Sequence, residues 1–202
     1  MGQFAEPFCK GLRVLLVEDE AIVAMLTEGM LIELGCDAVV LAGSVSQALR
    51  AIEERTPDLA VLDVNLRGNF QMAQAVIPHL REKGGGAIVL MSSIAGQAGG
   101  GVFGRAHYAA AKAGLAGLAK ALARELAPEG IRANAIAPGV IDNDFTKGRM
   151  TREIKDEMAT KVPLGRLGTS EEVANVCLFL ASDMSSYVTG TVISVNGGLL
   201  IA

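Results

Sequence analysis

A regular alternation of short apolar runs with amphipathic segments constrains the fold of this chain more than any other feature. The first amphipathic segment carries Ile22, Met25, Leu26 and Met30 at helical spacing and stops at Gly35. Alternation of this kind is typical of parallel strands joined by right-handed helical crossovers. The strands that we expect span residues 12–17, 37–42, 59–62, 87–91, 132–137 and 191–195.

We therefore predict an α/β fold in which residues 1–202 form one domain. The expected architecture is a doubly wound, three-layer αβα sandwich around a six-stranded parallel sheet with strand order 2-1-3-4-5-6. This order reverses between strands 1 and 3, and ligands of such sheets bind there, beyond the carboxyl ends of the strands. Composition agrees, since 50% of the residues are hydrophobic and only 4% aromatic, as expected for strands covered on both faces.

Charge and cysteine content exclude several classes of protein. A net charge of −4 gives no electrostatic reason to expect nucleic acid or an anionic membrane as a partner. Cys9, Cys36 and Cys177 are too widely spaced for a metal pattern or a disulfide framework. No apolar run reaches the roughly 18 residues of a membrane span, and no signal peptide precedes the first strand. We expect a cytoplasmic protein.

Acidic residues follow two of the expected strands. Glu18 and Asp19 follow the first strand, and Asp63 follows the third. Carboxylates at this edge could bind Mg²⁺, and a carboxylate beside that ion could accept a phosphoryl group. They could equally be solvated acids at strand ends, and the pattern alone leaves both interpretations open.

The strings LRVLLVEDEAIVAMLTEGMLIELG and PDLAVLDVNLRG resemble the first half of a response-regulator receiver domain, which is flavodoxin-like. The resemblance implies a receiver-like half over residues 12–67 with Asp63 as the phosphoacceptor. It also implies weak Mg²⁺ binding by Glu18, Asp19, Asp63 and the backbone carbonyl of Asn65.

Receiver domains also need a Ser or Thr after strand 4 and a Lys after strand 5. Ser93 meets the first requirement, but the fifth strand ends in Ile136-Ala137-Pro138-Gly139 and has no lysine. The phosphorylation site implied by the resemblance is therefore incomplete.

The strings GGGAIVLMSSIAG, HYAAAKAGLAGLAKALARELAPEGIRANAIAPG and SEEVANVCLFLASDMSSYVTGTVISVNGG resemble the short-chain dehydrogenase/reductase family, which has a Rossmann fold, and especially its 3-oxoacyl carrier-protein reductases. The resemblance assigns residues 68–202 to a dehydrogenase-like half with Asn65, Ser93, Tyr108 and Lys112 as catalytic residues. Tyr108 and Lys112 are one helical turn apart, and an ammonium close to a phenol stabilises the phenolate. A lone pair of this spacing also occurs on ordinary helix surfaces.

Two departures from that family concern the cofactor. Its members carry a glycine-rich turn after the first strand, which lets the backbone approach a pyrophosphate. Residues 17–21 here read VEDEA, without glycine and with three acids. Asn143 also replaces the Thr that usually meets the nicotinamide amide. We therefore predict that the NAD(P) site is lost, that no cofactor other than possibly Mg²⁺ binds, and that the inherited catalytic residues are inactive.

Three functions follow from these patterns. The first is an engineered or recombined chimera, joined near residues 63–68, that folds but lacks a complete activity and is not an enzyme. The second is a vestigial receiver module that binds Mg²⁺ and accepts phosphate. The third is a working NAD(P)-dependent oxidoreductase of the short-chain dehydrogenase family. Nicotinamide binding separates the third from the other two.

Two expected helices carry more small and apolar residues than a single sheet contact needs. Residues 70–82 and 108–126 are rich in Ala, Gly, Val and Leu. We predict a homodimer or tetramer through these surfaces. The alternative is that their Ala-rich faces simply pack closely on the sheet.

Overall fold

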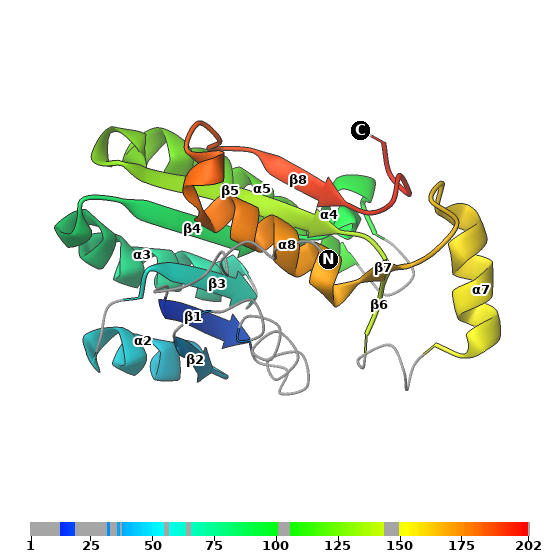
Figure 1. Ribbon diagram of the computed structural model, residues 1–202, viewed down its shortest axis with the longest axis horizontal. Helices are drawn as coiled ribbons and strands as arrows, with labels where there is room; N and C mark the ends of the chain where they lie inside the picture. Colours follow the sequence, from blue (N-terminus) through cyan, green and yellow to red (C-terminus); the bar gives the residue numbers. More distant parts are fainter. Residues whose placement is uncertain are drawn as a thin grey trace, which may run out of the picture.

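The computed structural model describes residues 13–18, 32, 36, 38–54, 57–63, 66–100, 106–143 and 150–201, without the side chains of residues 17, 18, 45 and 59–63. Within these residues the main sheet has six strands in the order β2-β1-β3-β4-β5-β8, and every neighbouring pair is parallel. The predicted α/β class is confirmed (Figure 1). The strands are β1 (Arg13–Glu18), β2 (Ala38–Ala42), β3 (Leu59–Asp63), β4 (Gly86–Met91), β5 (Ile131–Pro138) and β8 (Val192–Val195).

Helices cover both faces of this sheet. One core cluster joins α2, α3 and α5 to one face, and a second joins α8 to the other. Alternate residues of β1 serve the two clusters, since Leu15 belongs to the first and Val14 and Leu16 belong to the second. The helices are α2 (Val45–Glu54), α3 (Leu66–Lys83), α4 (Ile94–Ala98), α5 (Ala106–Leu126), α7 (Arg152–Lys161) and α8 (Ser170–Ala181), with single 3₁₀ turns η1 (Ala127–Glu129) and η2 (Asp183–Ser185).

A small second sheet extends from the carboxyl side of the main one. It pairs β6 (Ile141–Asp142) with β7 (Gly168–Thr169), and α7 lies beside it, beyond the strand tips (Figure 1). Helix α7 begins after Thr151, whose hydroxyl accepts a hydrogen bond from the Ile154 N–H at 3.4 Å. No apolar stripe marks α7 in the amino-acid sequence, because this helix has no buried residue. Among the described helices, none combines the length and the apolar character that crossing a membrane would require.

Candidate functional site

The carboxyl ends of the parallel strands lie at one edge of the sheet, where a ligand is expected. Glu18 at the end of β1 and Asp63 at the end of β3 are register partners, so the two strand ends meet as predicted. The side chains of both residues lie outside the described part of the chain, as do Asp19 and Asn65 entirely. The predicted phosphoacceptor and Mg²⁺ ligands therefore fall where no side-chain geometry is described.

The next strand end carries the first described site residue. Ser93 follows β4 and caps α4, because its Oγ accepts a hydrogen bond from the Ala95 N–H at 3.1 Å. A hydroxyl can accept and donate at the same time. The cap therefore fixes the Ser93 oxygen while its own O–H can still point to a ligand.

Helix α5 supplies the other two described site residues. The Lys112 Nζ lies 5.6 Å from the centroid of the Tyr108 ring, within the range of a cation–π contact. Lys112 is 7% exposed, whereas Tyr108 is 37% exposed. The pair thus presents a phenol to the solvent side of the edge with a buried positive charge behind it.

The end of β4 holds this lysine at two points. The Lys112 Nζ donates a hydrogen bond to the Met91 carbonyl at 2.8 Å. The Ser92 Oγ, itself buried, donates to the Lys112 carbonyl at 2.7 Å. Ser92 was not predicted as a site residue, because its partner Lys112 lies 20 residues further along the chain. No local sequence pattern indicates a contact over that distance.

Close packing of α4 on α5 completes this part of the edge. A Cβ added to Gly96 would lie 2.6 Å from the Ala113 nitrogen and 2.7 Å from the Lys112 carbonyl carbon. Only a glycine lets α4 approach the backbone of α5 so closely, next to the residue that carries the ammonium. The structure therefore brings the segment of Ser93 against the helix of Tyr108 and Lys112.

A hollow of about 550 Å³ lies between α7 and the β6–β7 pair. Its rim carries two ion pairs: the Lys155 Nζ is 2.5 Å from Asp142 Oδ1, and Arg166 makes two hydrogen bonds to Glu172 at 2.5 and 2.9 Å. The bonds from Arg166, together with one from the Thr169 N–H, lower the pKa of Glu172 to about 2. Sequence reasoning missed this rim, although the capping-box spacing of Thr169 and Glu172 is a readable signal.

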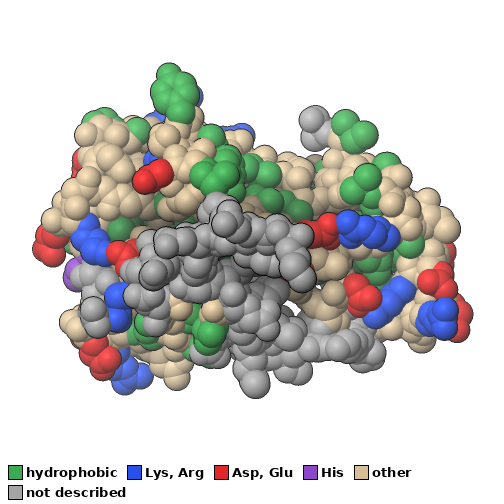
Figure 2. All heavy atoms as spheres, in the orientation of Figure 1, with side chains coloured by type: hydrophobic (Ala, Val, Ile, Leu, Met, Phe, Trp, Pro, Cys, Tyr) green, Lys and Arg blue, Asp and Glu red, His purple; other side chains and the backbone are tan. Residues whose placement is uncertain are grey.

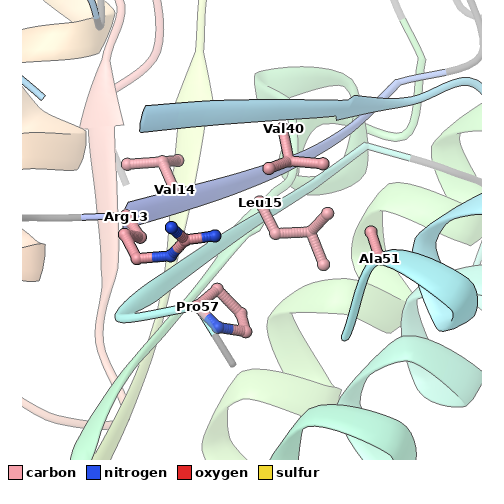
Figure 3. Close-up of a pocket in the computed structure, with 6 residues that line it drawn as sticks. All are labelled: Arg13, Val14, Leu15, Val40, Ala51 and Pro57. Carbon is pink, nitrogen blue, oxygen red and sulfur yellow. The ribbon is translucent and has the colours of Figure 1, made fainter. Parts of the chain in front are cut away.

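Other features of the described residues offer no competing site. A cavity of about 10 Å³ lies beside Arg13 and Pro57 at the amino end of β1 (Figure 3), which is room for about one water. No cluster of His, Cys, Asp or Glu within the described ranges could hold a metal. Burial raises the pKa of the Cys177 thiol to about 12. Acidic and basic side chains lie side by side on the face drawn in Figure 2.

Comparisons with known proteins find matches to dehydrogenases and reductases along most of the chain. The family model described as enoyl-(acyl carrier protein) reductase matches residues 18–200. An uncharacterized short-chain type dehydrogenase/reductase of Sinorhizobium fredii is 42% identical over 92% of this chain and 74% of its own length. A 3-oxoacyl-[acyl-carrier-protein] reductase of Thermotoga maritima is 47% identical over 70% of this chain, which spans 56% of that relative. Among solved structures, a gluconate 5-dehydrogenase from Burkholderia cenocepacia, crystallised in complex with NADP and tartrate, has a fold similar to this chain. The TM-score is 0.78 at 24% sequence identity, and the likeness covers 96% of this chain and 97% of that one.

These findings correct the prediction of a two-part chimera. A single family match runs from residue 18 to residue 200, through the segment assigned to a receiver-like half and across the junction expected near residues 63–68. The assignment of residues 12–67 to a receiver domain is therefore wrong, and so is a chimera without a complete activity. The physical reason is that an apolar strand followed by acidic residues occurs at strand ends of many doubly wound sheets. The pattern therefore does not identify one family.

The predicted loss of the NAD(P) site is also wrong. That prediction relied on the missing glycines of residues 17–21, yet the family match begins inside this turn. The similar solved structure shares its fold with 96% of this chain, so the sheet that such a turn belongs to is kept. One divergent turn is thus a weaker guide to the cofactor than the sheet and the site residues taken together.

Proposed function

Because the chain belongs to the short-chain dehydrogenase/reductase family, we propose that it is an NAD(P)-dependent oxidoreductase that interconverts a carbonyl group and an alcohol. The observation that carries this proposal is the exposed phenol of Tyr108 backed by the buried ammonium of Lys112 at the carboxyl edge of the sheet. We also propose that the chain works as a single domain.

The described site residues have complementary tasks in such a reaction. The Ser93 hydroxyl donates a hydrogen bond to the substrate oxygen and so orients the carbonyl. Tyr108 then gives its hydroxyl proton to that oxygen, which becomes the alcohol. Negative charge develops on the Tyr108 oxygen as the proton leaves, and the nearby Lys112 ammonium stabilises it. The opposite direction uses the same groups with the proton moving back.

The cofactor would lie across the carboxyl edge where the strand order reverses, between β1 and β3. When bound, NAD(P)H supplies the hydride that reduces the carbonyl carbon, and NAD(P)⁺ takes it up in the opposite direction. The residues present would suit a nicotinamide cofactor and a carbonyl substrate, because the hydroxyl of Ser93 and the Tyr108–Lys112 pair belong to α4 and α5, which pack together at this edge. Of the turn at residues 17–21, only the backbone of residues 17 and 18 belongs to the described part of the chain.

A 3-oxoacyl thioester is the substrate class that we propose first. The Thermotoga maritima relative, at 47% identity, is named a 3-oxoacyl-[acyl-carrier-protein] reductase. The hollow of about 550 Å³ beside α7 is within the volume range of small-molecule sites. The elements that line it, α7 and the β6–β7 pair, lie on the carboxyl side of the sheet (Figure 1), so the hollow could receive the acyl portion.

We propose that two copies of the chain associate through α3 and α5. Phe70 on α3 is 48% exposed and Leu66, at the start of the same helix, is 38% exposed. Leu66 also contacts α5, since its Cδ2 lies 2.7 Å from an ideal Cβ at Gly114. The two helices therefore form one continuous surface that a second copy could cover.

The test of the proposed function is the oxidation of NADPH and NADH, followed by absorbance, with acetoacetyl thioesters and gluconate-type ketones as substrates. We expect turnover by the unaltered chain and a loss of about 100-fold or more in kcat for Tyr108→Phe, the scale of a lost general acid. Glu53→Gln, at an exposed position of α2 away from this hollow, is the control and should retain activity. No turnover of any carbonyl by the unaltered chain, together with no saturable cofactor binding, would contradict the proposal.

A further inference from the structure

We propose that Ser92 is a positioning residue that sets the place of the Lys112 ammonium behind Tyr108. This inference rests on the proposed function and extends it to a residue outside the set Asn65, Ser93, Tyr108 and Lys112. The contact that carries the inference is the hydrogen bond from the Ser92 Oγ to the Lys112 backbone carbonyl. Ser92 therefore acts through the backbone of the lysine.

The first step of the argument is how firmly Ser92 itself is held. It follows β4 directly, and its N–H donates to the Ile136 carbonyl of β5 at 2.8 Å. Ser92 is 4% exposed, so water does not compete for its hydroxyl. Its Oγ is therefore fixed to the two central strands of the sheet.

The second step is that two consecutive residues hold the two ends of one side chain. The Ser92 Oγ donates to the Lys112 carbonyl at 2.7 Å, and the Lys112 Nζ donates to the Met91 carbonyl at 2.8 Å. The lysine is thus tied at its backbone and at its charged end to adjacent positions of the strand end. Such a closed arrangement leaves the ammonium little freedom to move away from the ring of Tyr108.

The third step is that α5 does not need the hydrogen bond from Ser92 to the Lys112 carbonyl in order to form. Lys112 lies inside α5, where a regular helix already gives its carbonyl the N–H of Ala116 as a donor. A carbonyl oxygen has two lone pairs, so the Ser92 hydroxyl is an additional donor. The added bond joins α5 to β4 at the residue that bears the ammonium, where Gly96 also packs on the helix.

The consequence for the reaction follows from distance. The stabilisation that a positive charge gives to a developing phenolate falls as the separation grows. Without the Ser92 hydroxyl, α5 can shift relative to β4, and the ammonium shifts with it. Misplacement of a catalytic group by about 1 Å can cost about 100-fold in rate, so even part of that movement is measurable.

The experiment compares Ser92→Ala, Ser92→Thr and Ser185→Ala. Ser185 is the matched control, because its buried Oγ also donates to a backbone carbonyl, that of Leu180 at 3.0 Å, but at the far end of α8. We expect Ser92→Ala to lower kcat about 10-fold or more with KM changed less than about threefold. Ser92→Thr, which keeps the hydroxyl, should restore most of kcat. Ser185→Ala should lower the melting temperature and leave kcat within about twofold.

A second readout does not depend on activity. Each protein is treated with an amine-labelling reagent, and the labelling rate of Lys112 is compared with that of the exposed Lys120 by peptide mass spectrometry. We expect Lys112 to label faster in Ser92→Ala and at the unaltered rate in Ser92→Thr and Ser185→Ala. If Ser92→Ala does not fold by circular dichroism, Ser92→Cys replaces it, because a thiol fills similar space and is only a weak donor.

The two readouts separate the inference from the proposed function. If the unaltered chain reduces no carbonyl but Lys112 labels faster only without the Ser92 hydroxyl, the positioning of Lys112 stands and the proposed function falls. If Lys112 labelling is the same in all variants, or if Ser185→Ala lowers kcat as much as Ser92→Ala, the role of Ser92 is overturned.

Discussion

Replacing Gly96 with alanine tests the packing that holds the two halves of the site together. The added Cβ would lie 2.6 Å from the Ala113 nitrogen. Ordinary contact begins at 3.4 Å, so α4 has to move away by about 0.8 Å. The opposing atoms belong to the backbone of α5 and cannot rotate aside.

The cost in stability can be estimated from two opposing effects. Overpacking of this kind costs about 1–3 kcal/mol, and the better helix propensity of alanine returns up to about 1 kcal/mol. Because backbone atoms oppose the added Cβ, the overpacking cost should lie in the upper part of this range, about 2–3 kcal/mol. We therefore expect a net loss of about 1–3 kcal/mol, which in a chain of this size lowers the melting temperature by roughly 2–12 °C.

The same displacement should also slow the reaction. Ser93 caps α4, so a shift of that helix moves the Ser93 hydroxyl relative to Tyr108. We expect Gly96→Ala to lower kcat about 10-fold or more at a temperature where the variant is fully folded. Melting followed by circular dichroism and steady-state oxidation of NADPH are the two assays.

Gly117 provides the matched control. It lies in α5, and a Cβ added there meets no atom within 4 Å. Gly117→Ala should stabilise the chain by up to about 1 kcal/mol, seen as a rise in melting temperature of roughly 2–4 °C. Light scattering on the same samples separates folding from association. A Gly96→Ala variant with unaltered stability and unaltered kcat would refute the close packing of α4 on α5.

Three further predictions concern the rest of the molecule. Arg166→Gln should raise the pKa of Glu172 from about 2 towards its ordinary 4.5, and an NMR titration of the Glu172 carboxyl group measures this pKa. The ion pair between the two residues stabilises the fold above pH 4.5, and this stabilisation is lost as the pH falls towards 2. Arg132→Met removes bonds of 2.7–3.1 Å to Ser185 and to the carbonyls at the end of α8, and should cost about 2–3 kcal/mol, a fall of roughly 4–12 °C in the melting curve. Light scattering at micromolar protein should give the mass of a dimer or tetramer, and Phe70→Glu should reduce it; a monomer mass for the unaltered chain would contradict association through α3 and α5.

The backbone of the sheet could be predicted well because it follows from local patterns. The apolar run at residues 87–91 forms β4 (Gly86–Met91), and the strand expected at 132–137 forms β5 (Ile131–Pro138). Both strands are covered on two faces, but only β4 is continuously apolar. In β5, Arg132 and Asn134 interrupt the apolar residues and donate hydrogen bonds to the carbonyls of Leu180 and Val188. The spacing of Tyr108 and Lys112 likewise predicts one helical face, and both residues lie in α5.

Family and cofactor could not be predicted correctly from the first strand and its turn. The acids that follow β1 and β3 resemble a receiver domain, but they show only that two strand ends share one edge. Contacts between segments distant in sequence could not be predicted either. Ser92 meets Lys112 across 20 residues, and Gly96 meets α5 through space alone. Helix α7 was not predicted, because a helix without buried residues has no apolar stripe in its sequence.

Transfer of deuterium from the cofactor to the substrate is the most direct test of the central claim that Tyr108 and Lys112 serve a hydride-transfer site. The chain is mixed with NADPH that carries deuterium at the transferred hydride position and with an acetoacetyl thioester, and the product is examined by mass spectrometry. We predict a hydroxyacyl product with deuterium on the former carbonyl carbon, formed about 100-fold or more slowly by Tyr108→Phe. Product without deuterium, no product from the unaltered chain, or equal rates for the two proteins would contradict the account.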